Sequence, residues 1–440
     1  AMLVPGEMLV TFVLPSLKPD MIPGLTGSSN HVLGITHDQV HIARMREISR
    51  TKLQERVQAF RCQVAVNEPG CQHASARGLR GLFSVSPDTP ETQADQAFDF
   101  DAAHALYRDL FGDLDTAMSS QTHLIIAPPA DLLRLPFQAL VTTAAHPDRL
   151  ADADWLIKRH AVSVLPSLTA LRGLRGGPQA DRQLNHMIGF GDPLVGANLP
   201  AMNCDAIQTA ALRAAPAVGP QITQQSDGVV MLADVDHLRG FNRLLDTVCE
   251  LRAIRAVLDG SADLILGDAA TESRVKSLDQ QGTLETADVL VFATHGLTAG
   301  EAGAAAPGLL LTPPSKATLA DDGLLSAPEI AMLTLNADLV VLSACNTAAG
   351  DRADQDGLSG LARSFFQAGA RALFVTHWSV FSEASVDVST GMFAALKDDP
   401  NQLYAAALQT SVLAILHDPT RSPLQHHPAY WGAFFIVGAT

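Results

Sequence analysis

Short apolar runs alternate with amphipathic stretches along most of this chain. Apolar, β-branched-rich runs bounded by polar residues or glycine occur at residues 123–127, 162–167, 187–191, 263–266, 289–294, 339–344, 372–376 and 430–437. Such runs are typical of buried strands of a parallel sheet. Apolar residues at spacings of three and four predict helices at residues 49–62, 101–119, 168–174, 205–215, 241–258, 271–278, 358–369, 384–397 and 402–416. Strands alternating with helices predict an α/β fold with a mainly parallel sheet.

The first hundred residues carry a weaker pattern than the rest of the chain. Residues 32–36 and 40–42 suggest a short strand pair, and 71–99 are rich in Gly, Ser, Pro and Asp, which is typical of a loop. A second α/β unit begins near residue 160. Within it, residues 194–236 have weak periodicity and are interpreted as an insertion.

Length and composition indicate a globular protein of two or three domains. The chain has 440 residues, of which 47% are hydrophobic and 17% charged, so it can bury a substantial core. Its formal net charge of −16 disfavours a nucleic-acid-binding surface, which normally has a basic face. The acidity also aids solubility, so it says little about the substrate.

The five cysteines are odd in number, scattered and without CxxC spacing: Cys62, Cys71, Cys204, Cys249 and Cys345. We therefore expect no disulfide framework and a reduced, cytoplasmic setting. No apolar stretch reaches the roughly 18–20 residues of a membrane helix. The N-terminus lacks a cationic region and is interrupted by prolines, so no signal peptide is expected. Alanine before Met2 suggests a piece of a longer protein.

Two of the predicted strands end on reactive residues. The run 289–294 is followed by His295 and Gly296, and the run 339–344 is followed by Cys345. Because catalytic groups of parallel sheets gather at the carboxyl ends of the strands, we expect the imidazole and the thiol to be neighbours. Their spacing, 345 − 295 = 50 residues, is about that of the histidine and cysteine of caspases.

These residue types suit a cysteine nucleophile. The thiolate of Cys345 would attack a carbonyl carbon, and His295 would protonate the leaving amine and later activate water. The backbone N–H groups of Gly296 and Cys345 would form the oxyanion hole. Taken singly, each residue has a plain alternative, since a buried cysteine is usually an apolar core residue and a histidine near a sheet edge is usually just hydrogen-bonded.

Several ordered blocks carry a family resemblance. They are found at residues 135–140, 189–193, 293–296, 308–311, 322–330, 338–347, 357–365, 368–371 and 427–434. Through these blocks, residues 105–440 resemble the CHAT family of caspase-like domains, which often occur with tetratricopeptide repeats.

The resemblance implies a caspase-like, mainly parallel central sheet with helices on both faces, and peptide-bond hydrolysis by a His295/Cys345 dyad without a cofactor. It implies a non-catalytic companion subdomain at residues 1–160, which packs on a catalytic domain at 161–440. A tetratricopeptide-repeat sensor, another sensor domain or a regulatory chain would be a partner beside the protein substrate. Direct binding to nucleic acid or membrane is not expected.

The resemblance also places a substrate pocket, at Asp192, Ser343 and the segment that follows residue 376, with His377, Trp378 and Ser379. Asp192 would receive a basic P1 residue, or it is simply a turn-forming aspartate in its Gly-Asp-Pro context. Trp378 is either a wall of the pocket or a core residue. Three departures from the family pattern lie near this pocket. They are His377 where an apolar residue is usual, the lack of proline at 379–380, and the long segment 194–236.

Two further features give weaker indications of function. The acidic loop 351–356 is a gating loop, a self-cleavage site or an ordinary solvated loop. His417, His426 and His427 lack metal-ligand spacing to a cysteine or carboxylate. We therefore expect a regulated cysteine endopeptidase of bacterial type, cytoplasmic, acting in signalling or defence. The alternative is a catalytically silent scaffold that binds proteins, although such a scaffold has no chemical need for His295 or Cys345.

Overall fold

The computed structural model describes residues 2–14, 30–46, 48–65, 71, 98–175, 184–196, 204, 232–258, 261–343 and 360–438. Two compact units divide the chain. The first unit comprises residues 1–178 and 403–440, and the second comprises residues 179–402. The C-terminal segment therefore belongs with the N-terminal unit. The functional division at residue 160 stays a prediction.

The first unit mixes a sheet with helices. Its strands are β1 (Glu7–Val13), β2 (His31–Ile35), β3 (Val40–Arg44), β4 (His123–Ala127), β5 (Ala161–Val164) and β14 (Phe434–Val437). Its helices are α1 (Arg50–Val64), α4 (Phe100–Phe111), α5 (Asp115–Met118), α6 (Leu156–Arg159), α7 (Ala170–Arg175), α14 (Tyr404–His417), α15 (Pro423–His426) and α16 (Pro428–Trp431).

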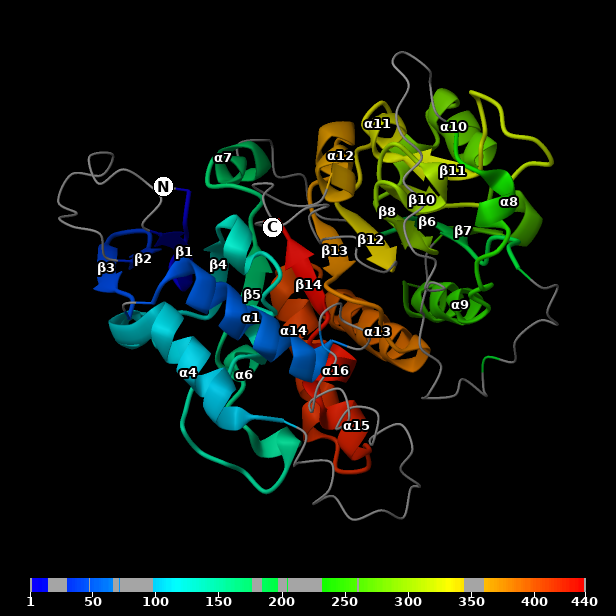
Figure 1. Ribbon diagram of the computed structural model, residues 1–440. Helices are drawn as coiled ribbons and strands as arrows, with labels where there is room; N and C mark the ends of the chain where they lie inside the picture. Colours follow the sequence, from blue (N-terminus) through cyan, green and yellow to red (C-terminus); the bar gives the residue numbers. More distant parts are fainter. Residues whose placement is uncertain are drawn as a thin grey trace. The chain divides into compact units, whose positions relative to one another are not determined.

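The sheet of the first unit runs in the order β3-β2-β1-β4-β5-β14. The pairs β1–β4, β4–β5 and β5–β14 are parallel, whereas the hairpin β2–β3 and the pair β1–β2 are antiparallel. The predicted strand pair near residues 32–42 is confirmed. Strand β1, in contrast, was missed, although its run Met8–Val10 is fully buried as in other central strands. Helices α1 and α4 lie side by side (Figure 1).

The second unit contains a parallel sheet and a small antiparallel one. Its strands are β6 (His186–Gly191), β7 (Ser261–Leu266), β8 (Val289–Ala293), β9 (Gly296–Leu297), β10 (Gly308–Leu310), β11 (Leu324–Ser326), β12 (Leu339–Ser343) and β13 (Leu373–Thr376). Its helices are α8 (Val235–Leu238), α9 (Asp246–Leu258), α10 (Glu272–Gln280), α11 (Ala327–Ile330), α12 (Gly360–Ala368) and α13 (Ser382–Asp398).

All strands of the larger sheet in the second unit are parallel, in the order β13-β12-β8-β6-β7. On one face, helix α9 comes so close to β6 that a Cβ atom at Gly189 would lie 2.7 Å from Leu251. Helices α9 and α13 lie side by side (Figure 1). Along β6 and β8, Phe190 and Phe292 stack at 5.0 Å, and Phe292 contacts Phe365 of α12. The predicted α/β architecture with mainly parallel strands is confirmed.

A small sheet of β9, β10 and β11 follows strand β8 directly. The buried carboxylate of Glu272 on α10 accepts hydrogen bonds from the backbone N–H groups of Asp322 (2.8 Å) and Gly323 (3.1 Å). Lys276 donates to both Glu272 and Glu329, and Glu329 completes a capping box with Ser326 at the start of α11. These bonds anchor β11, and through β10 they anchor the backbone of β9.

Some predicted boundaries were wrong. The helix predicted at 101–119 is interrupted at Gly112, which has a positive φ of 47° and ends α4. Helix α9 begins at Asp246 rather than at residue 241, and residues 428–431 form helix α16 before strand β14. Residues of the predicted helix at 205–215 and of the acidic loop at 351–356 lie outside the described residues.

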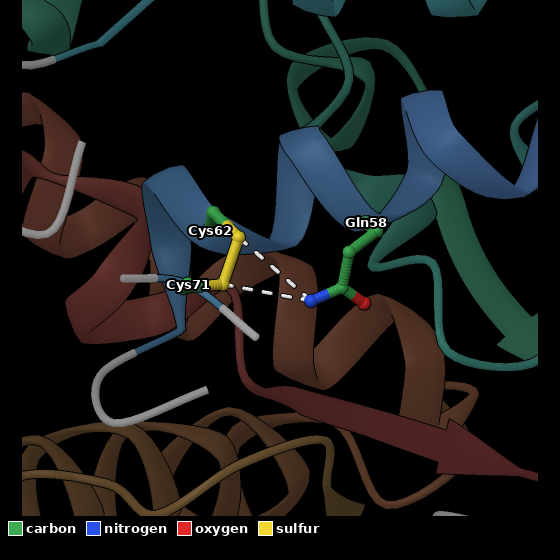
Figure 2. The surroundings of a disulfide bond; sticks show 3 residues. All are labelled: Gln58, Cys62 and Cys71. Atoms are coloured by element: carbon green, nitrogen blue, oxygen red, sulfur yellow. Dashed lines mark hydrogen bonds between the residues drawn. A yellow bond between two sulfur atoms is a disulfide. The ribbon is translucent and has the colours of Figure 1, made fainter. Parts of the chain in front are cut away.

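The expectation that the cysteines form no disulfides was wrong. Cys62 is bonded to Cys71, with Cα atoms 5.4 Å apart, and Cys204 is bonded to Cys249, with Cα atoms 5.3 Å apart. Figure 2 shows the first bond, where the side-chain amide of Gln58 donates to both sulfur atoms, at 3.8 and 3.5 Å. Sequence spacing could not reveal these pairs because chain folding brings the residues together. The argument for a reduced, cytoplasmic setting therefore loses its basis.

Within the described parts of the chain, no helix has the length and apolar character needed to cross a bilayer.

The two disulfides predict a thiol count. Unfolded without reductant, the chain should expose one thiol to Ellman's reagent, because Cys345 is the only cysteine of the sequence outside the two bonds. After reduction the count should rise to all five cysteines. The Cys204→Ser variant should expose one more thiol than the parent, since Cys249 loses its partner. A count of five without reductant would show that neither bond forms.

The buried His427 predicts a pH-dependent stability. Its Nδ1 accepts the N–H of Ala429 at 3.0 Å, and complete burial lowers the pKa of His427 to about 3. The unfolded chain, with an ordinary histidine pKa near 6.5, binds the proton first, so stability is full above about pH 6.5 and falls toward pH 3. Between pH 7 and pH 5 this histidine alone should cost about 2 kcal/mol.

The His427→Asn variant measures this contribution, because asparagine also caps a helix N-terminus but does not titrate. Urea unfolding followed by the fluorescence of Trp155 and Trp431 should show a shallower loss of stability with acid in the variant. His146→Asn is the control, since the side chain of His146 is 57% exposed. An unchanged pH slope in His427→Asn would contradict the prediction.

Candidate active site

The four central strands of the second unit end in one row. The register pairs Gly191 with Ala293 and Ala293 with Ser343, which are the last residues of β6, β8 and β12. Val341 pairs with Phe374, so the same row continues to Thr376, the last residue of β13. The predicted site residues that the structure describes therefore lie in this row or in the few positions that follow it. The carboxyl ends of parallel strands are where ligands and catalytic groups collect.

His295 is buried, and one of its ring nitrogens is held by a backbone carbonyl. Only 1% of the residue is exposed, and its Nε2 lies 2.6 Å from the carbonyl oxygen of Asn242. A carbonyl oxygen can only accept, so Nε2 carries the hydrogen and the lone pair of the neutral ring is on Nδ1. The ring also contacts Phe241, with centroids 5.4 Å apart. The imidazole therefore has a defined tautomer and orientation.

The backbone around His295 is tied to the small sheet. Thr294 donates its hydroxyl to the carbonyl of Leu310 at 2.5 Å, and the N–H of Leu310 donates to the carbonyl of His295 at 2.9 Å. Gly296, half-buried, starts strand β9 opposite Leu309. This pairing holds the Gly296 backbone, whose N–H is the predicted oxyanion donor.

Ser343 belongs to a buried polar network. Its hydroxyl donates to the carboxylate of Glu250 at 2.8 Å and lies 2.7 Å from the hydroxyl of Ser385. None of the three residues is more than 4% exposed. Because Glu250 lies on α9 and Ser385 on α13, the network ties two helices to the end of β12. Ser343 thus has a structural role, because its hydroxyl links the end of β12 to α9 and α13.

Asp192 is paired with an arginine. The guanidinium of Arg243 donates to both carboxylate oxygens, at 2.7 and 2.8 Å, and this pairing raises the pKa of Arg243. The backbone of Asp192 has a φ of 53°, and its N–H donates to the hydroxyl of Thr247 at 2.9 Å. These contacts are those of a turn-forming aspartate. The pocket role of Asp192 stays a prediction, and a basic P1 residue would have to compete with Arg243.

The segment after β13 is mostly buried. His377 and Trp378 are 3% and 2% exposed, and their rings stack with centroids 6.0 Å apart. Ser379 is half-buried. If the alignment of the strand ends continued for two more residues, Trp378 would lie level with His295. The predicted pocket role of these three residues stays untested.

Cys345 lies outside the described residues, whose nearest member before it is Ser343. The other four cysteines are paired in disulfides, so with both bonds formed Cys345 has no cysteine partner left in the sequence. A cysteine that is spared from disulfides can serve as a nucleophile.

Within the ranges that the structure describes, no group of three or more His, Cys, Asp or Glu side chains is arranged to hold a metal ion. His426 donates its Nε2–H to the carbonyl of Asp418, and His427 caps α16.

Sequence reasoning missed the residues that support this site. The carbonyl of Asn242 left no signal, because a backbone group is common to all residues. Arg243 and Thr247 lie in a segment predicted as plain helix. Glu250 could have been noticed, since it shares a buried face with Thr247 and Leu251, where a carboxylate needs a partner.

Comparison with known proteins supplies a family match. The model of the CHAT domain matches residues 101–439. Tetratricopeptide repeat protein 28 of Mus musculus is 33% identical over 116 residues, which make up 26% of this chain and 4% of that protein. The chain thus spans only a small part of this relative.

Solved structures with a similar chain path are distant in sequence. The Arg-specific cysteine proteinase gingipain R is 9% identical, with a TM-score of 0.41 over 88% of this chain and 74% of its own. The separase–securin complex of Saccharomyces cerevisiae is 9% identical, with a TM-score of 0.47 over 99% of this chain and 30% of the other.

The Asp192–Arg243 pair predicts a stability effect. Removing one partner of a buried, hydrogen-bonded ion pair leaves the other charge uncompensated, so Asp192→Asn should lower the free energy of unfolding by about 3 kcal/mol. The double variant Asp192→Asn/Arg243→Gln should lose less than the sum of the single losses. Urea unfolding followed by Trp378 fluorescence measures both.

The control is Asp236→Asn, which breaks an exposed pair with Arg239 and should cost under about 1 kcal/mol. Unchanged stability in Asp192→Asn would speak against a structural role of Asp192 and leave the substrate-pocket role in place.

Proposed function

Because this chain belongs to the CHAT domain family, whose model matches residues 101–439, we propose that it is a cysteine endopeptidase. Cys345 is the nucleophile and His295 is the base. The substrate is a protein, and cleavage is regulated by a sensor domain or partner chain. No cofactor takes part.

One observation carries the proposal: strands β8 and β12 pair without any shift. Each residue of β8 lies opposite the residue 50 positions later, as Val289 lies opposite Leu339 and Ala293 opposite Ser343. His295 and Cys345 are also 50 positions apart and each follows its strand by two residues. If the same register continued past the strand ends, positions 295 and 345 would be neighbours, which supports the proposed dyad.

The tautomer of His295 supports its role as base. Nδ1 would take the proton from the Cys345 thiol while Nε2–H stays bonded to the Asn242 carbonyl at 2.6 Å. The resulting imidazolium donates to that carbonyl and favours the thiolate electrostatically. A buried site strengthens both interactions because water does not screen them.

The reaction then follows the acyl-transfer pattern of cysteine nucleophiles. The thiolate of Cys345 attacks the peptide carbonyl, and the N–H groups of Gly296 and Cys345 stabilise the oxyanion. The imidazolium of His295 gives its proton to the departing amine. Water, deprotonated by His295, releases the acid product and restores the thiol.

For substrate specificity and for regulation of cleavage, the proposal names candidate residues and a class of partner. Asp192, Ser343, His377, Trp378 and Ser379 surround the ends of the strands, so they are the first residues to test for substrate contacts. The relative among tetratricopeptide repeat proteins supports a regulatory partner. We retain a role in signalling as part of the proposal, with the compartment open to test.

A peptide digest tests the activity. The chain and its Cys345→Ala variant are incubated with a proteome-derived peptide library and analysed by mass spectrometry. We expect cleavages in the parent that disappear in the variant, and His295→Ala should lower their rate by about 10²–10⁴-fold. Equal cleavage by Cys345→Ala would contradict the proposal.

Alkylation distinguishes a latent peptidase from a silent scaffold. Without reductant at pH 7, iodoacetamide should label Cys345, and His295→Ala should slow labelling about tenfold or more because the imidazole no longer favours the thiolate. His237→Ala is the matched control, since His237 contacts the same Phe241 ring as His295. Slow labelling that His295→Ala leaves unchanged, together with no cleavage, would support the silent scaffold.

A further inference from the structure

Among the described strands, β3 lies at an edge of the first unit's sheet (Figure 1). Across the hairpin, the N–H groups of Thr36 and Met45 donate to the carbonyls of Gln39 and Asn30, at 2.9 and 3.0 Å. In antiparallel pairs, the residues that bond the neighbour alternate with residues that point away from it. Odd-numbered residues of β3 therefore face β2, and even-numbered ones direct N–H and C=O to the outer edge.

The outward-facing positions also carry exposed apolar side chains. Val40 is 61% exposed and Ile42 is 55% exposed. Native proteins usually protect an edge strand with charges, proline or a bulge, because open backbone groups attract another strand. At Val40 and Ile42 this edge combines outward backbone groups with β-branched side chains, which favours strand addition.

The end of strand β3 lies at a pocket that is lined by several basic side chains. Arg44 and Arg46 line a cavity of about 700 Å³ together with His104 and Arg108 of α4, and with two aspartates, Asp113 and Asp115. A cavity of this volume can take several side chains of a peptide. All of these residues belong to the first unit.

Three arginines and two aspartates line this pocket, so its balance of charge is positive. Asp115 is balanced by Arg159, at 3.0 Å, and also accepts the hydroxyl of Tyr107. The carboxylate of Asp109 lies 3.9 Å from Arg46 and is bound more closely by Arg56. Arg108 is exposed. Since the whole chain has a net charge of −16, a cluster of arginines on one edge is a local exception that favours an anionic group.

We propose that β3 is a docking strand for an extended acidic segment of a partner protein. The segment adds a strand along Val40 and Ile42 through backbone hydrogen bonds and places an aspartate or glutamate side chain beside Arg46 and Arg108. Main-chain bonds supply affinity in such strand addition, and side-chain pockets supply specificity. The carboxylate fits because arginine pairs with it in a bidentate geometry. The proposal is independent of catalysis.

A displayed library of random twelve-residue peptides tests the proposal on the full chain carrying Cys345→Ala, so that a peptidase activity cannot consume the probe. Enriched peptides should alternate β-branched residues with Asp or Glu. Fluorescence anisotropy with these peptides should show at least tenfold weaker binding to Ile42→Pro and to the double variant Arg46→Glu/Arg108→Glu.

Ile42→Pro removes an outward N–H that β2 does not use, so the hairpin can keep its own bonds. Ile42→Thr is the matched control, because it keeps the N–H and the β-branched shape and should retain most of the binding. Circular dichroism must show that each variant is folded.

Three results would overturn the proposal. The first is a selection that enriches no peptide, or peptides whose binding Ile42→Pro leaves unchanged. The second is equal competition by polyglutamate or by a short oligonucleotide, which would mean charge attraction alone. The third is a dimer in light scattering that Ile42→Pro separates, which would mean that β3 pairs with a second copy of this chain.

Discussion

The unshifted pairing of parallel strands β8 and β12 is the constraint on which the rest of the candidate site depends. Because side chains alternate along a strand, a shift by one residue would turn every buried side chain of β12 to the opposite face. Both faces of the sheet are packed, so such a shift would place each side chain of β12 among neighbours that do not fit it. The register also aligns the last residues of β6 and β13 with those of β8 and β12. The described positions that follow β6, β8 and β13 therefore lie along one edge of the sheet.

Helix α9 and the segment before it organise the polar groups of this region. Asn242 orients the ring of His295, Arg243 neutralises Asp192, and Glu250 accepts the hydroxyl of Ser343. A buried carboxylate or imidazole without such partners would destabilise the fold, so each contact serves packing as well as orientation. Glycine at position 189 lets the Leu251 side chain of α9 pack directly on β6. The disulfide at Cys249 attaches a further segment of the chain to the same helix.

The first unit differs from the second in having a mixed sheet, whereas the larger sheet of the second unit is parallel. Its parallel strands are extended by an antiparallel hairpin, and its C-terminal strand β14 pairs with β5 after the chain has passed through the whole second unit. The hairpin ends the sheet with exposed apolar side chains beside a basic pocket. A unit of this kind can present a partner-binding edge while the other unit carries the chemistry, and the two roles can be tested separately.

Local sequence patterns were sufficient for most strands, which are continuous apolar runs, and for most helices, whose apolar residues recur at spacings of three and four. They also predicted strands β8 and β12, which His295 and Cys345 follow in the sequence, while the dyad itself stays a prediction. They were insufficient where distant segments meet. The run Met8–Val10 becomes a central strand only beside β4, and Gly112 ends α4 although the apolar spacing continues. The two disulfides, the Arg243 partner of Asp192 and the Asn242 carbonyl at His295 depend on residues brought together by folding. Their formation depends on distance and orientation in three dimensions, which spacing along the chain does not encode.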